Sequence, residues 1–296
     1  MTGGPTSEFR LGGHTVARTG YGAMQLTGPG VFGPPADRGE AIALLRTAIE
    51  LGVNHIDTAQ YYGPDVVNDL IRAALHPYPA DLAIVSKVAL RRGSRGEILP
   101  YDEPAQLRAG IEDNLRSLGI DRLAAVNLRM PDPTALPDAR FDEQLAAMVD
   151  ARDAGLIEGV GLSNVSRAQL EHALTATDVV TVQNSYSLTD RGSQAVLELT
   201  TERGISFVPY LPFGWPARTR LESLGSPVVQ EIAARTSATP AQVVLAWMLA
   251  LAPNVLLIPG TRSIGHLREN VAANDLQLAP RDVEALTAIT LAKDAQ

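Results

Sequence analysis

The sequence predicts an α/β protein of the TIM-barrel class, a (β/α)8 barrel preceded by a short N-terminal β-hairpin. Two observations predict it: eight short apolar runs alternate with helical patterns, and no glycine-rich GxGxxG turn follows the first run. The missing turn argues against a doubly wound sheet, the competing fold. The 296 residues fit one barrel, and no linker or low-complexity segment divides them, so we expect a single domain over residues 1–296.

The hairpin is expected over residues 9–17, around Gly12-Gly13. The runs that follow are rich in Val, Leu and Ile, as are strands buried on both faces of a parallel sheet. These expected barrel strands are Tyr21–Met24, Val53–Ile56, Leu82–Ser86, Leu123–Leu128, Glu158–Leu162, Val179–Gln183, Ile205–Pro209 and Val255–Ile258.

Helix starts are marked by a capping residue with Glu or Gln three positions later. Asp37, Ser166 and Thr239 fit this pattern, and Pro240 and Pro280 suit a first helical turn. A helix is also indicated by the spacing of Leu107, Ile111, Leu115 and Leu118.

The composition of the chain restricts the classes of partner and the cellular compartment that it suits. The net charge is −8, which disfavours a nucleic acid. The chain has no cysteine, which excludes disulfides, thiolate metal sites and a cysteine nucleophile and suits a reducing compartment. Residues 1–10 lack the apolar run of a signal peptide, and the longest apolar stretch, Val243–Ala252, is too short to span a bilayer. We therefore expect a cytoplasmic protein that binds a small molecule. The five histidines lack metal-ligand spacing, so no metal site is expected.

The chemistry of a barrel lies where its strands end. Polar residues follow nearly every expected strand at that rim: Asp57, Lys87, Arg129, Ser163-Asn164, Gln183-Asn184, Tyr210 and Thr261-Arg262-Ser263. This ring is the expected site.

Asp57, Tyr62 and Lys87 form the sharpest group in the ring. A lysine ammonium stabilises a phenolate and lowers the pKa of a tyrosine from about 10, and a carboxylate keeps the lysine charged. The trio thus builds a general acid from a phenol. Each residue also has a simpler explanation: Asp57 as a helix cap, Lys87 extending to solvent, and Tyr62 as a half-buried loop residue.

The ordered set of motifs resembles the aldo-keto reductase superfamily over essentially the whole chain. Its parts are Gly52–Ala59 with Tyr62-Gly63, Val85–Lys87, Gly161–Asn164, Val182–Asn184, and Ile258–Gly260 with Glu269-Asn270. Within that superfamily, residues 21–35, 126–129 and 257–270 are most similar to the bacterial pyridoxal reductases.

The resemblance implies an NADPH-dependent oxidoreductase that reduces an aldehyde or ketone, such as pyridoxal, to the alcohol. Tyr62 would donate the proton, Lys87 would lower its pKa, and Asp57 would hold Lys87. The implied NADPH/NADP+ site consists of Gly22, Ala23, Met24, Asp57, Ser163, Asn164, Gln183, Tyr210, Leu211, Pro212, Phe213, Gly214, Ile258, Gly260, Thr261, Arg262, Ser263, His266, Glu269 and Asn270.

Parts of this site have separate implied roles. Ser163, Asn164 and Gln183 would bind the nicotinamide carboxamide, and Tyr210 would stack on its ring. Residues 211–214 would lie along the pyrophosphate and residues 260–270 at the adenosine end. Ser263 is a plausible helix cap there, and Arg262 beside it fits the 2′-phosphate, although a solvated rim charge is the simpler interpretation.

The chain departs from the superfamily at the end of the fourth strand, where most members have a histidine and this sequence has Arg129. Strand alternation places Asn127 on the same face. Either could reach the substrate oxygen, and Arg129 could instead pair with a rim carboxylate. We expect a buried core role for His55 and a solvated loop over Leu90–Tyr101. The Thr27–Pro35 segment is either an active-site loop, with Val31 and Phe32 lining a pocket, or a connector.

Two other functions compete. One is a Schiff-base lyase using Lys87, which would require a desolvated lysine rather than one paired with Asp57. The other is an NADPH-binding sensor or accessory barrel with weak turnover, which the missing histidine makes conceivable.

Overall fold

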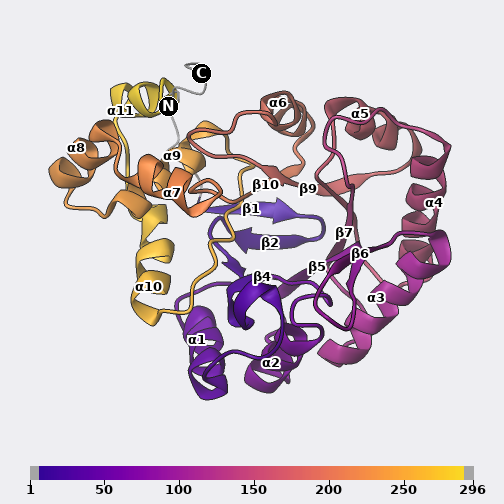
Figure 1. Cartoon of the computed structure of the whole chain (residues 1–296). Helices are drawn as coiled ribbons and strands as arrows, with labels where there is room; N and C mark the ends of the chain where they lie inside the picture. The colour runs from indigo at the N-terminus through magenta and orange to yellow at the C-terminus, as the bar shows by residue number, and fades with distance from the viewer. Residues whose placement is uncertain (1–6, 290–296) are drawn as a thin grey trace.

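The computed structural model describes residues 7–289. The expected hairpin is confirmed: β1 (Glu8–Leu11) pairs antiparallel with β2 (His14–Ala17). Figure 1 shows it lying across the centre of the ring of strands. Leu11 and Val16 pack against Ala83, Ala125 and Leu256, residues at the amino ends of barrel strands. The hairpin therefore closes the amino-terminal end of the barrel and leaves the opposite end for the site.

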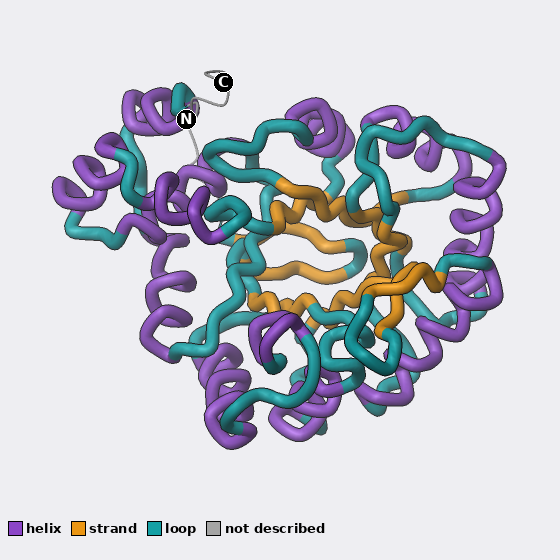
Figure 2. Tube along the Cα trace, in the orientation of Figure 1, coloured by secondary structure: helices purple, strands orange, loops and turns teal. Residues whose placement is uncertain are grey.

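Seven parallel strands follow one another around the ring in chain order. They are β3 (Tyr21–Gly22), β4 (His55–Asp57), β5 (Ala83–Arg92), β7 (Ala125–Arg129), β8 (Val160–Ser163), β9 (Val179–Ser185) and β10 (Ser206–Tyr210). Residues 255–257 close the ring, because Val255 bridges to Phe207 and Leu257 to Thr19. The (β/α)8 barrel is thereby confirmed, and Figure 2 shows the orange strands enclosed by purple helices.

The helices lie outside the strands (Figure 1). They are α1 (Arg38–Glu50), α2 (Val66–Leu75), α3 (Pro104–Leu118), α4 (Ala139–Asp153), α5 (Arg167–Ala176), α6 (Gln194–Arg203), α7 (Ala217–Leu224), α8 (Pro227–Thr236), α9 (Pro240–Leu251), α10 (Ile264–Ala272) and α11 (Pro280–Thr287). The predicted caps at Asp37, Ser166 and Thr239 are all present. No helix in the described part of the chain is both long and apolar enough to cross a membrane.

Three expectations about elements were wrong. The first strand ends at Gly22, and Ala23–Leu26 form a short 3-10 helix, η1. The eighth run makes only isolated bridges rather than a full strand. Leu90–Tyr101 is not a solvated loop, because β5 continues to Arg92 and pairs antiparallel with β6 (Ile98–Tyr101). Strands that extend beyond the barrel rim lack the continuous apolar run by which the others were found.

Candidate active site

The parallel strands bring the predicted polar residues to one rim. Lys87 on β5 is in register with Asn127 on β7, and Arg129 on β7 is in register with Ser163 on β8. Ser163 is in turn aligned with Gln183 on β9. Since neighbouring strands place aligned residues side by side, residues far apart in the sequence form one continuous group.

A buried ion pair lies at the centre of this group. Lys87 Nζ donates to Asp57 Oδ1 at 2.5 Å and to the Thr58 carbonyl at 3.1 Å, and both side chains are buried. Asp57 Oδ2 accepts from Gln183 Nε2 at 2.8 Å. Asp57 is therefore no helix cap, and Lys87 does not extend to solvent. Both oxygens of the Asp57 carboxylate therefore accept a hydrogen bond, and the ion pair is held in one geometry.

A second layer of hydrogen bonds fixes the segment that holds Lys87. Thr58 Oγ1 donates to Asn68 Oδ1 at 2.8 Å, and Asn68 donates to Asn114 on α3 at 3.0 Å. Ser86, next to Lys87, donates to the same Asn114 oxygen at 2.6 Å. These side chains are buried, so the network joins the two strand ends that carry Asp57 and Lys87. Sequence analysis did not identify it.

Tyr62 follows β4 and is only 7% exposed, so it is not a half-buried loop residue. Lys87 Nζ lies 5.0 Å from the centroid of its ring. Burial raises the pKa of the Tyr62 hydroxyl above its ordinary value, and the charge of Asp57 raises it further, while the guanidinium groups of Arg129 and Arg92 lower it. Arg129 and Arg92 are thus the cations that lower the pKa of this phenol, and Arg92 had not been singled out for this role.

Arg129 and Asn127 have different surroundings. Arg129 Nη1 donates to Ser163 Oγ at 3.1 Å, and its guanidinium carbon lies 5.2 Å from the Tyr210 ring centroid. It forms no ion pair with a carboxylate of residues 7–289, so the expected alternative of a rim ion pair is not found. Asn127 is fully buried, and neither of its side-chain polar atoms has a hydrogen-bond partner in the described part of the chain. Arg129 therefore faces the rim, whereas Asn127 lies within the barrel.

Asn127 also explains Gly161 on the adjacent strand. A Cβ added at Gly161 would lie 2.2 Å from Asn127 Oδ1, so the glycine makes room for the amide.

His55 also lies deep in the barrel. Burial lowers its pKa to about 4, which keeps the imidazole neutral. The expectation of a buried core histidine is confirmed, but the expected hydrogen bonds are not found, because neither ring nitrogen has a partner among residues 7–289.

The residues expected to hold the nicotinamide form a connected group. Tyr210 Oη donates to Asn164 Oδ1 at 2.9 Å, and Asn164 Nδ2 donates to the Met130 carbonyl at 2.8 Å. Asn164 has a left-handed backbone with φ 58°, a conformation that asparagine tolerates better than most residues. Ser163 and Gln183 beside them are buried.

A cavity of about 360 Å³ opens beside the segment after β10. Leu211, Gly214 and Trp215 form one side of it. The first two belong to the segment, residues 211–214, that is expected to lie along the pyrophosphate. Pro212 and Phe213 do not line it. Its other side had not been predicted: Ser185, Ser187, Thr189 and Asp190. The polar run after the expected strand Val179–Gln183 was the signal that would have identified them.

The segment after residue 258 forms the remaining part of the expected cofactor site. Ser263 caps α10, accepting from the His266 backbone N–H at 3.3 Å, as predicted. Arg262 and the His266 side chain are exposed, Glu269 is half-buried, and Thr261 and Asn270 are buried. Arg262 has no ion-pair partner among residues 7–289.

The glycines and the first strand require a correction. A Cβ at Gly22 would lie 2.3 Å from the Ile258 carbonyl oxygen, and one at Gly260 would lie 2.8 Å from the Gly22 carbonyl oxygen. Both glycines are therefore required because the backbone of another segment approaches them closely. Gly260 had been expected to allow the approach of a ligand. Ala23 is fully buried in η1, and Met24 is partly buried.

Comparison with known proteins identifies the family. The model of the aldo/keto reductase family matches residues 18–290. This chain belongs to the aldo/keto reductase family. It is accordingly an oxidoreductase, as its motifs predict. Pyridoxine 4-dehydrogenase of Escherichia coli is 45% identical to it over 287 residues, which is 96% of this chain and 99% of that protein.

Three other relatives show how widely the similarity extends. An uncharacterized oxidoreductase of Schizosaccharomyces pombe is 37% identical over 270 residues, 91% of this chain and 85% of that protein. Among solved structures, an aldo-keto reductase from Klebsiella pneumoniae in complex with NADPH is 26% identical with a TM-score of 0.80 and coverage of 95% and 93%. A thermostable aldo-keto reductase bound to the inhibitor epalrestat is 32% identical with a TM-score of 0.81 and coverage of 96% and 99%.

Proposed function

We propose that this protein reduces an aldehyde to the corresponding alcohol with NADPH, using Tyr62 as the proton donor. The observation that carries the proposal is the buried Lys87–Asp57 pair beside the Tyr62 ring, at the open end of the barrel. A buried charged pair next to a phenol has no evident structural use, since an apolar pair of similar size would serve stability as well. It suits proton transfer.

NADPH as the cofactor is supported by the solved Klebsiella pneumoniae relative, which holds it. The residues present here fit the group. The hydroxyl-lined cavity beside Leu211 and Gly214 offers donors for a pyrophosphate, and both oxygens of its one carboxylate, Asp190, already accept hydrogen bonds. The amino end of α10, with Arg262 beside it, offers free N–H groups and a cation to a phosphate. When bound, NADPH supplies the hydride.

The chain's own residues have separate roles in this proposal. Ser163, Asn164 and Gln183 orient the nicotinamide amide, and Tyr210 supports the ring. Tyr62 gives its hydroxyl proton to the carbonyl oxygen as the hydride reaches the carbon, and the phenolate left behind faces the cations of Lys87, Arg92 and Arg129. Because burial disfavours that phenolate, these cations are what makes proton donation feasible.

Arg129 is the residue we assign to orienting the substrate oxygen. It lies at the rim and has no carboxylate partner within residues 7–289, whereas Asn127 is enclosed. A guanidinium stays charged at all physiological pH values, so it can hold the carbonyl but cannot supply the proton. Tyr62 is then the acid.

Pyridoxal is the aldehyde we propose as a substrate, because the 45% identical relative is named for the oxidation of pyridoxine. The test follows NADPH absorbance with purified protein and a panel of aldehydes and ketones that includes pyridoxal. Turnover of pyridoxal supports the proposal. Turnover of another carbonyl compound but not of pyridoxal would reject pyridoxal as the substrate and still support carbonyl reduction. If no compound of the panel is turned over, the NADPH-binding sensor is favoured.

The Schiff-base lyase can be separated by trapping. Lys87 and Lys293 are the only two lysines, so a Lys293→Arg protein leaves Lys87 as the sole lysine side chain. We expect no substrate adduct on Lys87 after borohydride treatment, because its amine is buried and already bound to Asp57 and to the Thr58 carbonyl. An adduct on Lys87, located by peptide mass spectrometry, would support the lyase.

A further inference from the structure

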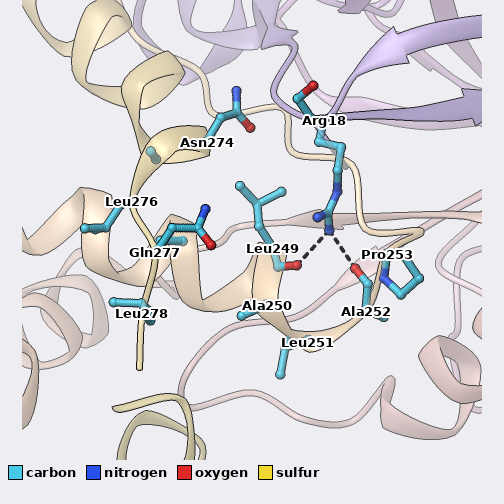
Figure 3. A pocket seen from close by; sticks show the side chains of 13 residues that line it. Arg18, Leu249, Ala250, Leu251, Ala252, Pro253, Asn274, Leu276, Gln277 and Leu278 are labelled. Carbon is cyan, nitrogen blue, oxygen red and sulfur yellow. Dashed lines mark hydrogen bonds between the residues drawn. The ribbon is translucent and has the colours of Figure 1, made fainter. Parts of the chain in front are cut away.

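A second cavity, of about 360 Å³, lies away from the active site. Its walls come from the end of α9, from the segment after α10 and from Arg18, which precedes β3 (Figure 3). Arg18 and Pro253 both lie before the strand segments that follow them, so the cavity is at the amino-terminal end of the barrel. Tyr62 and Lys87 lie at the carboxyl-terminal end.

Arg18 is the central residue of this cavity and is only 2% exposed. Its Nη2 donates to the Leu249 and Ala252 carbonyls at 2.7 and 2.6 Å, and its Nε donates to the Val255 carbonyl at 3.1 Å. The first two carbonyls belong to the carboxyl end of α9, which carries a partial negative charge. Two of the three guanidinium nitrogens, Nε and Nη2, therefore donate hydrogen bonds to backbone carbonyls.

The third nitrogen, Nη1, has no partner among residues 7–289, and Arg18 forms no ion pair there. Figure 3 shows the guanidinium beside Leu249, with both drawn hydrogen bonds leaving from the same nitrogen. Burial without a carboxylate lowers the pKa of Arg18 to about 10. A buried cation that is balanced only by carbonyl dipoles favours an anion.

The rest of the wall is amphipathic. No acidic side chain among residues 7–289 lines it. Asn274 also lies at this wall, where its Oδ1 accepts from Thr19 Oγ1 at 2.9 Å and its amide nitrogen is directed away from Arg18 (Figure 3). Leu249, Leu276 and Leu278 supply an apolar surface in the same cavity as Arg18.

We propose that this cavity binds an aliphatic carboxylate. The carboxylate group accepts from Arg18 Nη1, and the hydrocarbon chain packs against Leu249, Leu276 and Leu278. A guanidinium and a carboxylate form short charge-assisted hydrogen bonds. A cavity of this volume is at the lower end of the range of about 300–1,000 Å³ for small-molecule sites, which suits a chain of medium length.

The test is calorimetric titration of the full chain with hexanoate, in the presence and absence of NADPH. Hexanamide, which has the same chain but no charge, is the control ligand, and inorganic phosphate tests whether charge alone suffices. Because replacement of Arg18 would also remove the cap of α9, the decisive variant is Gln277→Glu, which adds a carboxylate at an exposed position of the wall. Gln230→Glu, at an exposed position on α8, is the matched variant.

We expect hexanoate to bind with or without NADPH, and hexanamide and phosphate to bind at least tenfold more weakly. Gln277→Glu should weaken hexanoate binding by about tenfold or more, because the added carboxylate repels the ligand and competes for the charge-assisted contact with Arg18, and Gln230→Glu should leave it unchanged. Absence of hexanoate binding, equal binding of the amide, or equal affinity in the two variants would overturn the proposal. Circular dichroism melts confirm that both variants are folded.

Discussion

Lys87 is distinctive at the scale of single residues, because arginine supplies almost every other cation in this chain. Arginine has a wide, permanently charged fork, whereas a lysine ammonium is compact. Here the compact group lies 2.5 Å from Asp57 Oδ1 and 5.0 Å from the centroid of the Tyr62 ring. The near absence of lysine is a sequence signal that singles out Lys87 without any motif.

Replacing Lys87 with methionine should cost both stability and activity. Asp57 would be left buried without a cation, which typically costs about 3–5 kcal/mol of unfolding free energy. Adding Asp57→Asn should restore much of that stability in urea melts while reductase activity stays low. Recovery of activity in the double variant would mean that the ion pair is structural.

His55 predicts an acid-dependent loss of stability. Burial lowers its pKa from 6.5 to about 4, so between these values the unfolded chain binds more protons than the folded protein. The unfolding free energy should therefore fall as the pH drops from about 6.5 to 4, by roughly 3 kcal/mol from this residue. His55→Gln should flatten that dependence in urea melts at several pH values, and His76→Gln, at an exposed position, should not. Parallel profiles for the two variants would contradict the assignment.

At the scale of elements, the β5–β6 hairpin extends past the rim and reaches the loops around Tyr62. Arg92 donates to the Gly96 carbonyl at 2.6 Å, to the Gly30 carbonyl at 3.2 Å and to the Tyr61 carbonyl at 3.4 Å. Gly33 in the adjacent loop donates to the Gly63 carbonyl at 2.8 Å. The hairpin and the Thr27–Pro35 loop are thus held against the segment that carries Tyr62, which favours an active-site loop over a simple connector.

Arg92→Met should therefore loosen this wall and remove a cation that lowers the pKa of Tyr62. We expect KM for the carbonyl substrate to rise by about tenfold, the equivalent of one or two hydrogen bonds. The apparent pKa of the catalytic acid in the kcat profile should move upward. Arg91→Met, the neighbour on the same strand, is the control, and identical profiles for the two variants would exclude Arg92 from this role.

The amino end of α10 predicts the choice of cofactor. Arg262 is exposed there and has no ion-pair partner within residues 7–289. A charge-assisted bond to the 2′-phosphate contributes about 1.5–3 kcal/mol, so Arg262→Ala should weaken NADPH binding by roughly 10- to 100-fold and leave NADH binding nearly unchanged. Arg268→Ala, on the same helix, controls for general charge. Fluorescence titration measures all four affinities, and equal losses for NADPH and NADH would remove the phosphate role.

At the scale of the whole molecule, alternation of strands and helices predicted the barrel, and the strand ends predicted most of the polar ring. Residues that follow an apolar run were found because the run itself is visible. The sequence pattern placed Arg92 in a solvated loop, which was wrong. The part of β5 that continues past the rim has no apolar pattern by which a strand could be predicted. The Asn68–Asn114 network was missed because its partners are 46 residues apart and meet only through packing. Gly22 and Gly260 were assigned to the cofactor site, although their close contacts are with backbone.

The central claim is that the whole barrel serves to hold one phenol as an acid beside a buried ion pair. Tyr62→Phe tests it most directly, because the substitution removes one hydroxyl and retains the ring packed near Lys87. Single-turnover reduction of pyridoxal should slow by about 10²- to 10⁴-fold, while fluorescence titration shows NADPH affinity within about threefold of the parent protein. A single-turnover rate within a few-fold of the parent, with NADPH bound, would contradict the account.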